Sequence, residues 1–343
     1  MGKIGIIANP ASGKDIRRLV AHAFVVSNNE KANIVSRILA GLAAVEHPEV
    51  VIMPDKFGIG RQAMSELQRL NPQAVQNVRL LDMDFAGAGI DTLRAARQMA
   101  AEGAGCIITL GGDGTARLAA QGAGETPVLP LSTGTNNVLP VFLEGTVAGL
   151  AAGWVAAHPG QARQDYCYRS KRLEIWVDGV YRDLALVDVA VVQGLFTGSR
   201  AVWEADQITG VFVTRASPGA IGLSSVAGLI EPVGLEDAYG LQVALGGEEA
   251  IFEVLAPLAP GLVSRLSVRR VARLFPGQPA VVEHARPVVL ALDGEREITL
   301  QPQESAAVHL SLEGPWIVDV DRVMRLAAGD GYFKNQHNGS GPA

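Results

Sequence analysis

Residues 106–115 read Cys-Ile-Ile-Thr-Leu-Gly-Gly-Asp-Gly-Thr, an apolar run that stops at three glycines around one aspartate. A helical pattern follows over residues 115–121, so the stretch predicts a strand, a short loop and a helix. Gly111, Gly112 and Gly114 can adopt backbone angles closed to other residues and let an oxyanion approach the main chain. The N–H groups at the start of the helix would also attract an anion. The loop therefore predicts a phosphate-binding site.

Asp113 is unusual in such a loop. A carboxylate repels phosphate, so a carboxylate in a phosphate-binding loop is explained by one of two roles. It can accept the proton of a hydroxyl group, or it can help to hold a metal ion. We therefore expect Asp113 to be catalytic. The alternative is that Asp113-Gly114 forms only a tight turn, as Asp-Gly pairs often do.

Two more polar loops follow predicted strands. The first contains Asn9, Ser12 and Gly13, and it differs from a P-loop because Asp15 replaces the Ser or Thr that would bind magnesium. The second follows the strand at 128–131 and carries Thr133, Gly134, Thr135, Asn136 and Asn137. Each loop could contact phosphate or merely cap a helix. Three such loops at one sheet edge favour a nucleotide site.

Composition narrows the class of protein. The chain has 343 residues, of which 48% are hydrophobic, so it can bury a large core and should form two domains. A net charge of -6 argues against nucleic acid or an anionic membrane as the main partner. Cys106 and Cys167 lack the spacing of a disulfide framework or a zinc site, and His22, His47 and His158 have no partner at metal-ligand spacing. We expect a cytoplasmic protein without a protein-built metal site, which associates as a homo-oligomer.

The two halves of the chain differ in pattern. Apolar runs at 4–8, 50–53, 78–81, 106–110 and 128–131 alternate with helical patterns and predict a parallel sheet. From about residue 160, hairpin patterns with Asp-Gly turns at 178–179 and 293–294 predict a β-rich domain, in which these two aspartates are turn residues. We place the α/β domain at 1–158 and the β-rich domain at 159–315. The segment 316–343 is expected to return to the first domain.

These motifs resemble the superfamily of NAD kinases and diacylglycerol kinases, and within it the NAD kinase-like proteins of the acetoin catabolism protein X family. The resemblance rests on the loop at 111–115, with the loops at 9–13 and 133–137 on either side. It implies a Rossmann-like α/β nucleotide domain followed by a β-sandwich domain, with the site between them. It also implies that Asp113 activates the acceptor and that the glycines and Thr115 contact phosphates.

The acceptor side departs from the family pattern. NAD kinases carry an Asn-Glu pair on a strand of the second domain, where this chain has Val187-Asp188. Asp188 keeps one carboxylate for substrate binding, although a strand-edge role fits it equally well. The resemblance implies transfer of a phosphoryl group from ATP, with Mg²⁺, or from polyphosphate to NAD or a related nucleotide. A nucleotide-binding regulator without turnover and a lipid kinase-like enzyme are the alternatives.

Overall fold

The first domain is built on a seven-stranded sheet of order β3-β2-β1-β4-β5-β18-β6. The structure is a computed structural model that describes residues 2–12, 26–45, 47–134, 137–193, 205–247 and 249–334. β1 to β5 are parallel, which confirms the predicted βα units. The strands are β1 (Lys3–Ala8), β2 (Glu49–Ile52), β3 (Val78–Leu80), β4 (Ala104–Gly111), β5 (Val128–Ser132), β6 (Cys167–Arg169) and β18 (Trp316–Val318).

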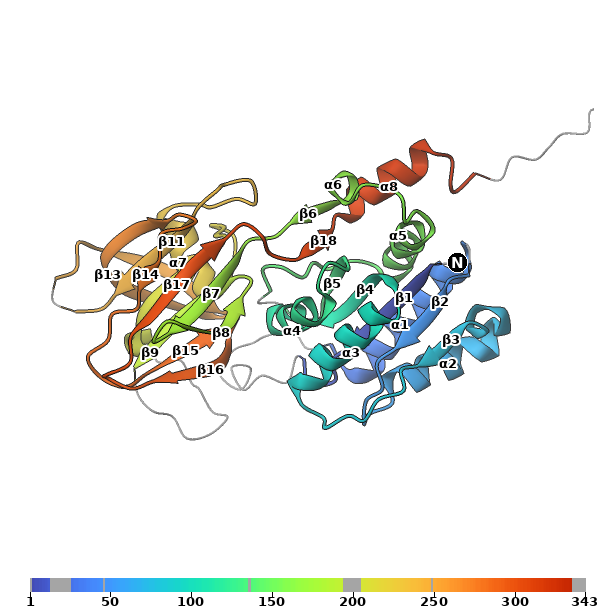
Figure 1. Cartoon of the computed structure of the whole chain (residues 1–343), viewed down its shortest axis with the longest axis horizontal. Helices are drawn as coiled ribbons and strands as arrows, with labels where there is room; N and C mark the ends of the chain where they lie inside the picture. Colours follow the sequence, from blue (N-terminus) through green and yellow to red (C-terminus); the bar gives the residue numbers. More distant parts are fainter. Residues whose placement is uncertain are drawn as a thin grey trace, which may run out of the picture.

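Helices cover both faces of this sheet (Figure 1). One face packs against α1 (Asn28–Ala43), α2 (Ile59–Leu70), α5 (Gly145–Ala157) and α8 (Val320–Gly329), with the 3-10 helix η2 (Pro72–Val75) and α6 (Arg163–Tyr166) beside them. The other face packs against α3 (Gly89–Ala101) and α4 (Asp113–Ala123). Because both faces are buried, the strands read as continuous apolar runs rather than as alternating ones. The sequence also has a helical pattern at residues 16–26, which predicts a helix that falls mostly outside the described residues.

The strand order reverses between β1 and β4. Strands β2 and β3 extend the sheet on one side of β1, and β4 and β5 extend it on the other. Open α/β sheets bind ligands outside the carboxyl ends of their strands at such a switch point. The loops after β1 and β4 lie on either side of it, and the loop after β5 is next to them.

The second domain is a β-sandwich, as expected. One sheet has the order β12-β13-β11-β10-β9-β15-β16 and the other β14-β17-β7-β8. Their facing sides share one core, and α7 (Leu223–Ile230) covers the outer face of the larger sheet. The strands are β7 (Arg172–Val177), β8 (Val180–Ala185), β9 (Asp188–Gln193), β10 (Ile208–Val213), β11 (Gly240–Leu245), β12 (Phe252–Ala259), β13 (Leu262–Leu274), β14 (Ala280–Val281), β15 (Val288–Leu292), β16 (Glu295–Leu300) and β17 (Ala306–Ser311), and the 3-10 helix η3 spans Ala205–Gln207.

The chain passes between the domains through two adjacent segments. β6 lies in the first sheet, antiparallel to β18, although it falls within the range 159–315 that we assigned to the second domain. The crossing lies at Ser170, whose N–H donates to Pro315 O at 2.9 Å and whose carbonyl accepts from Gly314 N–H at 2.8 Å. β18 and α8 then lie with the first domain (Figure 1). The sequence showed no break at Ser170 because β6 is only three residues long.

Candidate functional site between the domains

The three polar loops meet at the carboxyl edge of the first sheet. Asn9 Nδ2 donates to Thr115 Oγ1 at 2.8 Å, which joins the first loop to the glycine-aspartate loop. The hydroxyl oxygens of Ser12 and Thr133 lie 3.0 Å apart, which joins the first loop to the third. Thr133 N–H donates to the carbonyl of Gly111 at 3.1 Å. The structure thus brings these five residues together.

A buried lysine fixes the first loop. Lys31 lies in the first turn of α1, and its Nζ donates to the carbonyls of Asn9 at 2.9 Å and Ser12 at 2.8 Å. The side chain is fully buried, so these carbonyl oxygens replace the water that its ammonium group loses. Lys31 is not among the site residues that the sequence predicts. Its signal is that Lys31 occupies the buried stripe of α1 that continues at Val35, Ile38 and Leu42.

The glycines of the glycine-aspartate loop (residues 111–115) are required because neighbouring groups leave no space for a side chain, and not because of their backbone angles. None of them has a positive φ, and Gly112 has φ -104, which any residue adopts. The expectation of unusual backbone angles is therefore wrong. A Cβ on Gly111 would lie 2.4 Å from the Thr115 side chain, and one on Gly112 would lie 2.8 Å from Asn137 Oδ1. A Cβ on Gly114 would lie 2.6 Å from the carboxylate of Glu295 in the second domain.

Asp113 begins α4 and is only 8% exposed. Its Oδ1 accepts the N–H of Leu139 at 2.8 Å, and its Oδ2 accepts the N–H of Val138 at 3.0 Å. Burial, followed by the nearby charge of Asp293, raises the pKa of Asp113 to about 6, against the opposing effect of the two N–H groups. The carboxylate therefore anchors the segment after the third loop and is also a stronger base than an ordinary aspartate.

Hydrogen bonds among its own polar groups hold the third loop, which follows β5, in place. Ser132 Oγ donates to the carbonyl of Gly134 at 2.7 Å, and Asn137 Nδ2 donates to Ser132 Oγ at 2.7 Å. Thr133 is 1% exposed. Gly13, Thr135 and Asn136, which we expect in the site, lie outside the described residues, so a meeting of Asn136 with Asn9 and Asp113 stays a prediction.

The second domain contributes acidic groups at the same place. Arg117 of α4 is 1% exposed in its side chain and reaches Asp183 Oδ2 at 3.0 Å and Glu295 Oε2 at 3.3 Å. Its Nε lies 3.9 Å from Asp293 Oδ2. Asp293 in turn accepts the backbone N–H groups of Leu186, Val187 and Asp188 at 2.8, 2.8 and 3.1 Å.

Asp293 is a turn residue, as its Asp-Gly pattern predicts, with φ 48 between β15 and β16. It is also part of the domain interface, which the pattern did not indicate. Burial raises the pKa of its carboxyl group, while Arg117 and the three N–H groups oppose that rise. Asp188, expected to bind substrate, begins β9 next to this turn and is 8% exposed. Val187 packs into the core cluster of the first domain.

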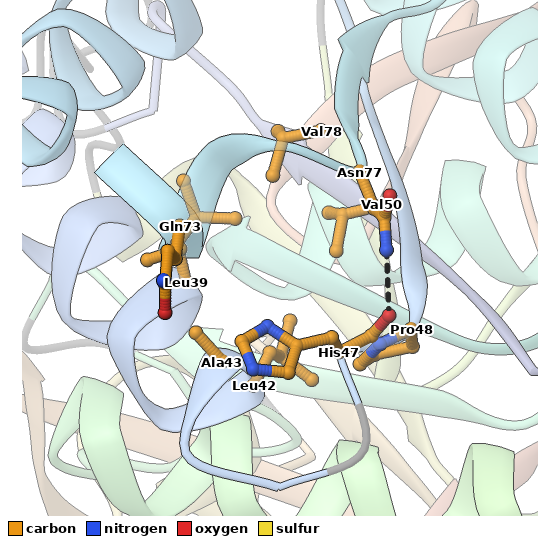
Figure 2. A pocket seen from close by; sticks show the side chains of 10 residues that line it. Leu39, Leu42, Ala43, His47, Pro48, Val50, Gln73, Asn77 and Val78 are labelled. Atoms are coloured by element: carbon orange, nitrogen blue, oxygen red, sulfur yellow. Dashed lines mark hydrogen bonds between the residues drawn. The ribbon is translucent and has the colours of Figure 1, made fainter. Parts of the chain in front are cut away.

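A separate pocket lies at the opposite edge of the first sheet, near the amino ends of β2 and β3. Figure 2 shows the side chains that line it and the hydrogen bond of 3.0 Å from Asn77 Nδ2 to the carbonyl of His47. Most of its lining is apolar and comes from α1, η2 and the two strand starts, among them Leu39, Leu42 and Val78. The pocket is remote from the three loops.

Among the described residues, no group of three or more His, Cys, Asp or Glu side chains is arranged to hold a metal ion. None of the helices that the structure describes is long and apolar enough to cross a membrane.

Comparisons with known proteins agree with this architecture. Residues 4–158 match the model of the ATP-NAD kinase N-terminal domain, and residues 171–313 match that of the acetoin catabolism protein X C-terminal domain. The acetoin catabolism protein X of Cupriavidus necator strain H16 is 42% identical over 334 residues, which cover 94% of this chain and 92% of that protein.

Two solved structures are similar to the chain, and the first of them shares its fold. The yeast NADH kinase complexed with NADH has a TM-score of 0.51 and 13% identity, over 100% of this chain and 89% of that one. A putative diacylglycerol kinase from Bacillus anthracis strain Sterne has a TM-score of 0.47 and 12% identity, over 92% and 97% of the two chains. Identity over nearly the full length to the Cupriavidus protein, with matches to both domain models, shows that this chain belongs to the acetoin catabolism protein X family and has an NAD kinase-like fold.

Proposed function

We propose that this protein transfers a phosphoryl group from ATP or polyphosphate to a hydroxyl group of NAD or a related nucleotide. The position of Asp113 carries the proposal. Its carboxylate is buried at the first turn of α4, where three polar loops meet and where the second domain approaches through Glu295. The match of the first domain to the ATP-NAD kinase model supports this class of reaction.

In this proposal Asp113 is the base that accepts the proton of the acceptor hydroxyl. A pKa of about 6 leaves the carboxylate mostly ionised at pH 7 and makes it more basic than a solvated aspartate. The carboxylate is held in place by Val138 and Leu139, so little reorganisation is needed when the proton moves. Asp188 is the residue that we assign to the acceptor nucleotide.

The loops around Asp113 are assigned to the phosphates. Gly112 caps α4 without a side-chain acceptor, and the first-turn N–H groups of a helix have no partner within the helix. These groups attract phosphate oxygens. The remaining phosphate contacts come from the three loops, namely Asn9, Ser12, Gly13, Gly111, Gly112, Gly114, Thr115, Thr133, Gly134, Thr135, Asn136 and Asn137.

ATP and Mg²⁺ are the cofactors in this proposal. Mg²⁺ that is bound to nucleotide phosphates needs only one or two protein carboxylates. Glu295 fits that requirement, because its side chain is 48% exposed and lies against Gly114. When bound, the ion would neutralise part of the negative charge on the phosphates.

A nucleotide-binding regulator is the second candidate, and one observation favours it. Both oxygens of Asp113 accept backbone N–H groups, which is the arrangement of a residue that anchors a loop. A regulator would bind nucleotide at the same loops and would need Asp113 only for their structure.

Measurement of NADP formation by the purified chain, with ATP or polyphosphate as donor, distinguishes the two functions. General acid–base catalysis typically contributes about a hundred- to ten-thousandfold, so Asp113→Asn should lower turnover by at least that order and keep nucleotide affinity. Asp178→Asn, in an exposed hairpin turn, is the matched control and should leave turnover unchanged. Nucleotide binding without phosphoryl transfer in the natural chain, or normal turnover in Asp113→Asn, would contradict the proposed catalysis.

A further inference from the structure

Arg215 and Arg269 are half-buried arginines without an ion pair among the described residues, but the Nε of Arg269 donates to the carbonyl of Leu245 at 3.2 Å, whereas the Nε of Arg215 has no acceptor there. Arg117 pairs with Asp183, and Arg169 pairs with Glu125. Arg172 pairs with its neighbour Glu174. Arg215 is half-buried, and among the described residues no carboxylate lies within ion-pair distance of its guanidinium.

The guanidinium of Arg215 is only partly used by hydrogen bonds. It donates through Nη2 to the carbonyl of Val138, and it also bonds the side chain of Tyr168. Its Nε is buried and has no hydrogen-bond acceptor among the described residues. A guanidinium carries five N–H donors in a planar fork, so Arg215 keeps donor capacity.

The position of Arg215 links it to the candidate site. It follows β10 in the second domain and reaches across to Val138, whose N–H holds Asp113. Its positive charge acts on the Asp113 carboxylate and lowers the pKa of that group. The side chain therefore lies at the domain interface, close to the end of the third loop.

We propose that Arg215 binds a phosphate group of a nucleotide at the interface between the domains. A cation without a carboxylate partner, with a donor left buried and unbonded, costs free energy in the unliganded protein. Phosphate oxygens would satisfy both the charge and the donors, and arginine binds them through two parallel N–H groups. This assignment rests on the proposed function, because it takes the domain interface beside Asp113 to be a nucleotide site.

Inorganic tripolyphosphate is the first probe. It should raise the melting temperature of the natural chain, since a ligand that binds only the folded state stabilises it. Arg215→Met should lose that shift, and the matched control Arg265→Met, whose arginine is 70% exposed on β13, should keep it. Arg215→Lys keeps the charge without the fork and should bind tripolyphosphate more weakly than the natural chain and more tightly than Arg215→Met. No shift in the natural chain, or an equal shift in Arg215→Met, would overturn the assignment.

Nucleotide probes then identify the source of the phosphate. Arg215→Met should weaken binding of ATP or of NAD by about ten- to a hundredfold in calorimetry, while adenosine binding is unchanged. Weaker binding of ATP alone assigns Arg215 to the donor, and weaker binding of NAD alone assigns it to the acceptor. Equal loss of adenosine binding would indicate a structural role and would overturn the proposal.

Failure of this inference is separable from failure of the proposed function. If the natural chain turns over and Arg215→Met binds phosphate as well as the natural chain does, Arg215 is not part of the site. The phosphotransferase proposal then still stands. If phosphate binding depends on Arg215 but the chain shows no turnover on any nucleotide acceptor, the assignment of Arg215 stands and the phosphotransferase proposal fails.

Discussion

Asp113-Gly114 and Asp293-Gly294 are the same dipeptide and lie on opposite sides of the domain interface. Asp113 opens a helix, whereas Asp293 sits in a hairpin with φ 48. Both carboxylates are buried, and both accept backbone N–H groups from a segment distant in sequence. The negative charge of Asp293 contributes to the raised pKa of Asp113.

Local sequence context sets the backbone conformation of an Asp-Gly pair but not the contacts of its carboxylate. The flanking elements, a strand and a helix at Asp113 and two strands at Asp293, set the backbone of each Asp-Gly pair. They do not set which groups its carboxylate contacts. Asp178-Gly179 is another such pair, and among the described residues its exposed aspartate side chain accepts only the N–H of Ser305, at 2.9 Å. Burial at the interface, not the turn, makes Asp293 different from Asp178.

The largest effect is expected from Asp293→Ala. The change leaves three N–H groups without their acceptor and takes one carboxylate from buried Arg117. Removal of one partner of a buried ion pair costs about 3–5 kcal/mol, so the free energy of unfolding should fall by that amount in urea denaturation. Asp178→Ala is the control, with an expected loss of about 1 kcal/mol or less. Equal losses in the two variants would contradict the difference drawn between these turns.

A pH effect of intermediate size is expected from Asp113. Its folded-state pKa of about 6 lies above the ordinary value of 3.8, so the folded protein holds this proton more tightly. The resulting stability is fully present below about pH 4 and is lost as the pH rises through about 6.

Comparison with a variant that cannot titrate isolates this contribution. The difference in unfolding free energy between the natural chain and Asp113→Asn should change by about 2.5 kcal/mol from pH 4 to pH 7, at about 1.4 kcal/mol for each pKa unit. A difference that does not vary with pH would show that the Asp113 pKa is not raised.

The smallest effect is expected from the glycines that follow or precede the two aspartates. Gly294 has φ 79, so Gly294→Ala should cost about 1–2 kcal/mol of unfolding free energy. Gly112 has an ordinary φ, and Gly112→Ala meets only the movable amide of Asn137. Gly112→Ala should therefore change stability less than Gly294→Ala and should weaken ATP binding, as calorimetry can measure. The reverse order of the two stabilities would contradict this account.

The sequence predicts the first domain well because its signals are local. The strand at Cys106–Leu110 and the following helix are set by apolar runs, periodicity and glycine, all within about fifteen residues. The meeting of the loops after β1, β4 and β5 also follows from the rule for parallel sheets, and the contact between Asn9 and Thr115 agrees with it.

The rest of the site depends on contacts between distant positions. Arg117 meets Glu295 across 178 residues, and Asp293 meets Val187 across 106. No periodicity within either segment encodes such a pair. A lysine on the buried stripe of α1 is a local signal, but it indicates only that Lys31 needs oxygen partners and not which ones.

The paired crossing at β6 and β18 makes the whole second domain an insert within the first. Arg169 and Trp316 are partners in register, so the chain leaves and re-enters the first domain at neighbouring points. A short turn between them would close β6 and β18 into a hairpin and leave the seven-stranded sheet complete. The same geometry leaves the two domains to be held against each other, away from this two-strand neck, by noncovalent contacts such as those of Arg117 with Asp183 and Glu295.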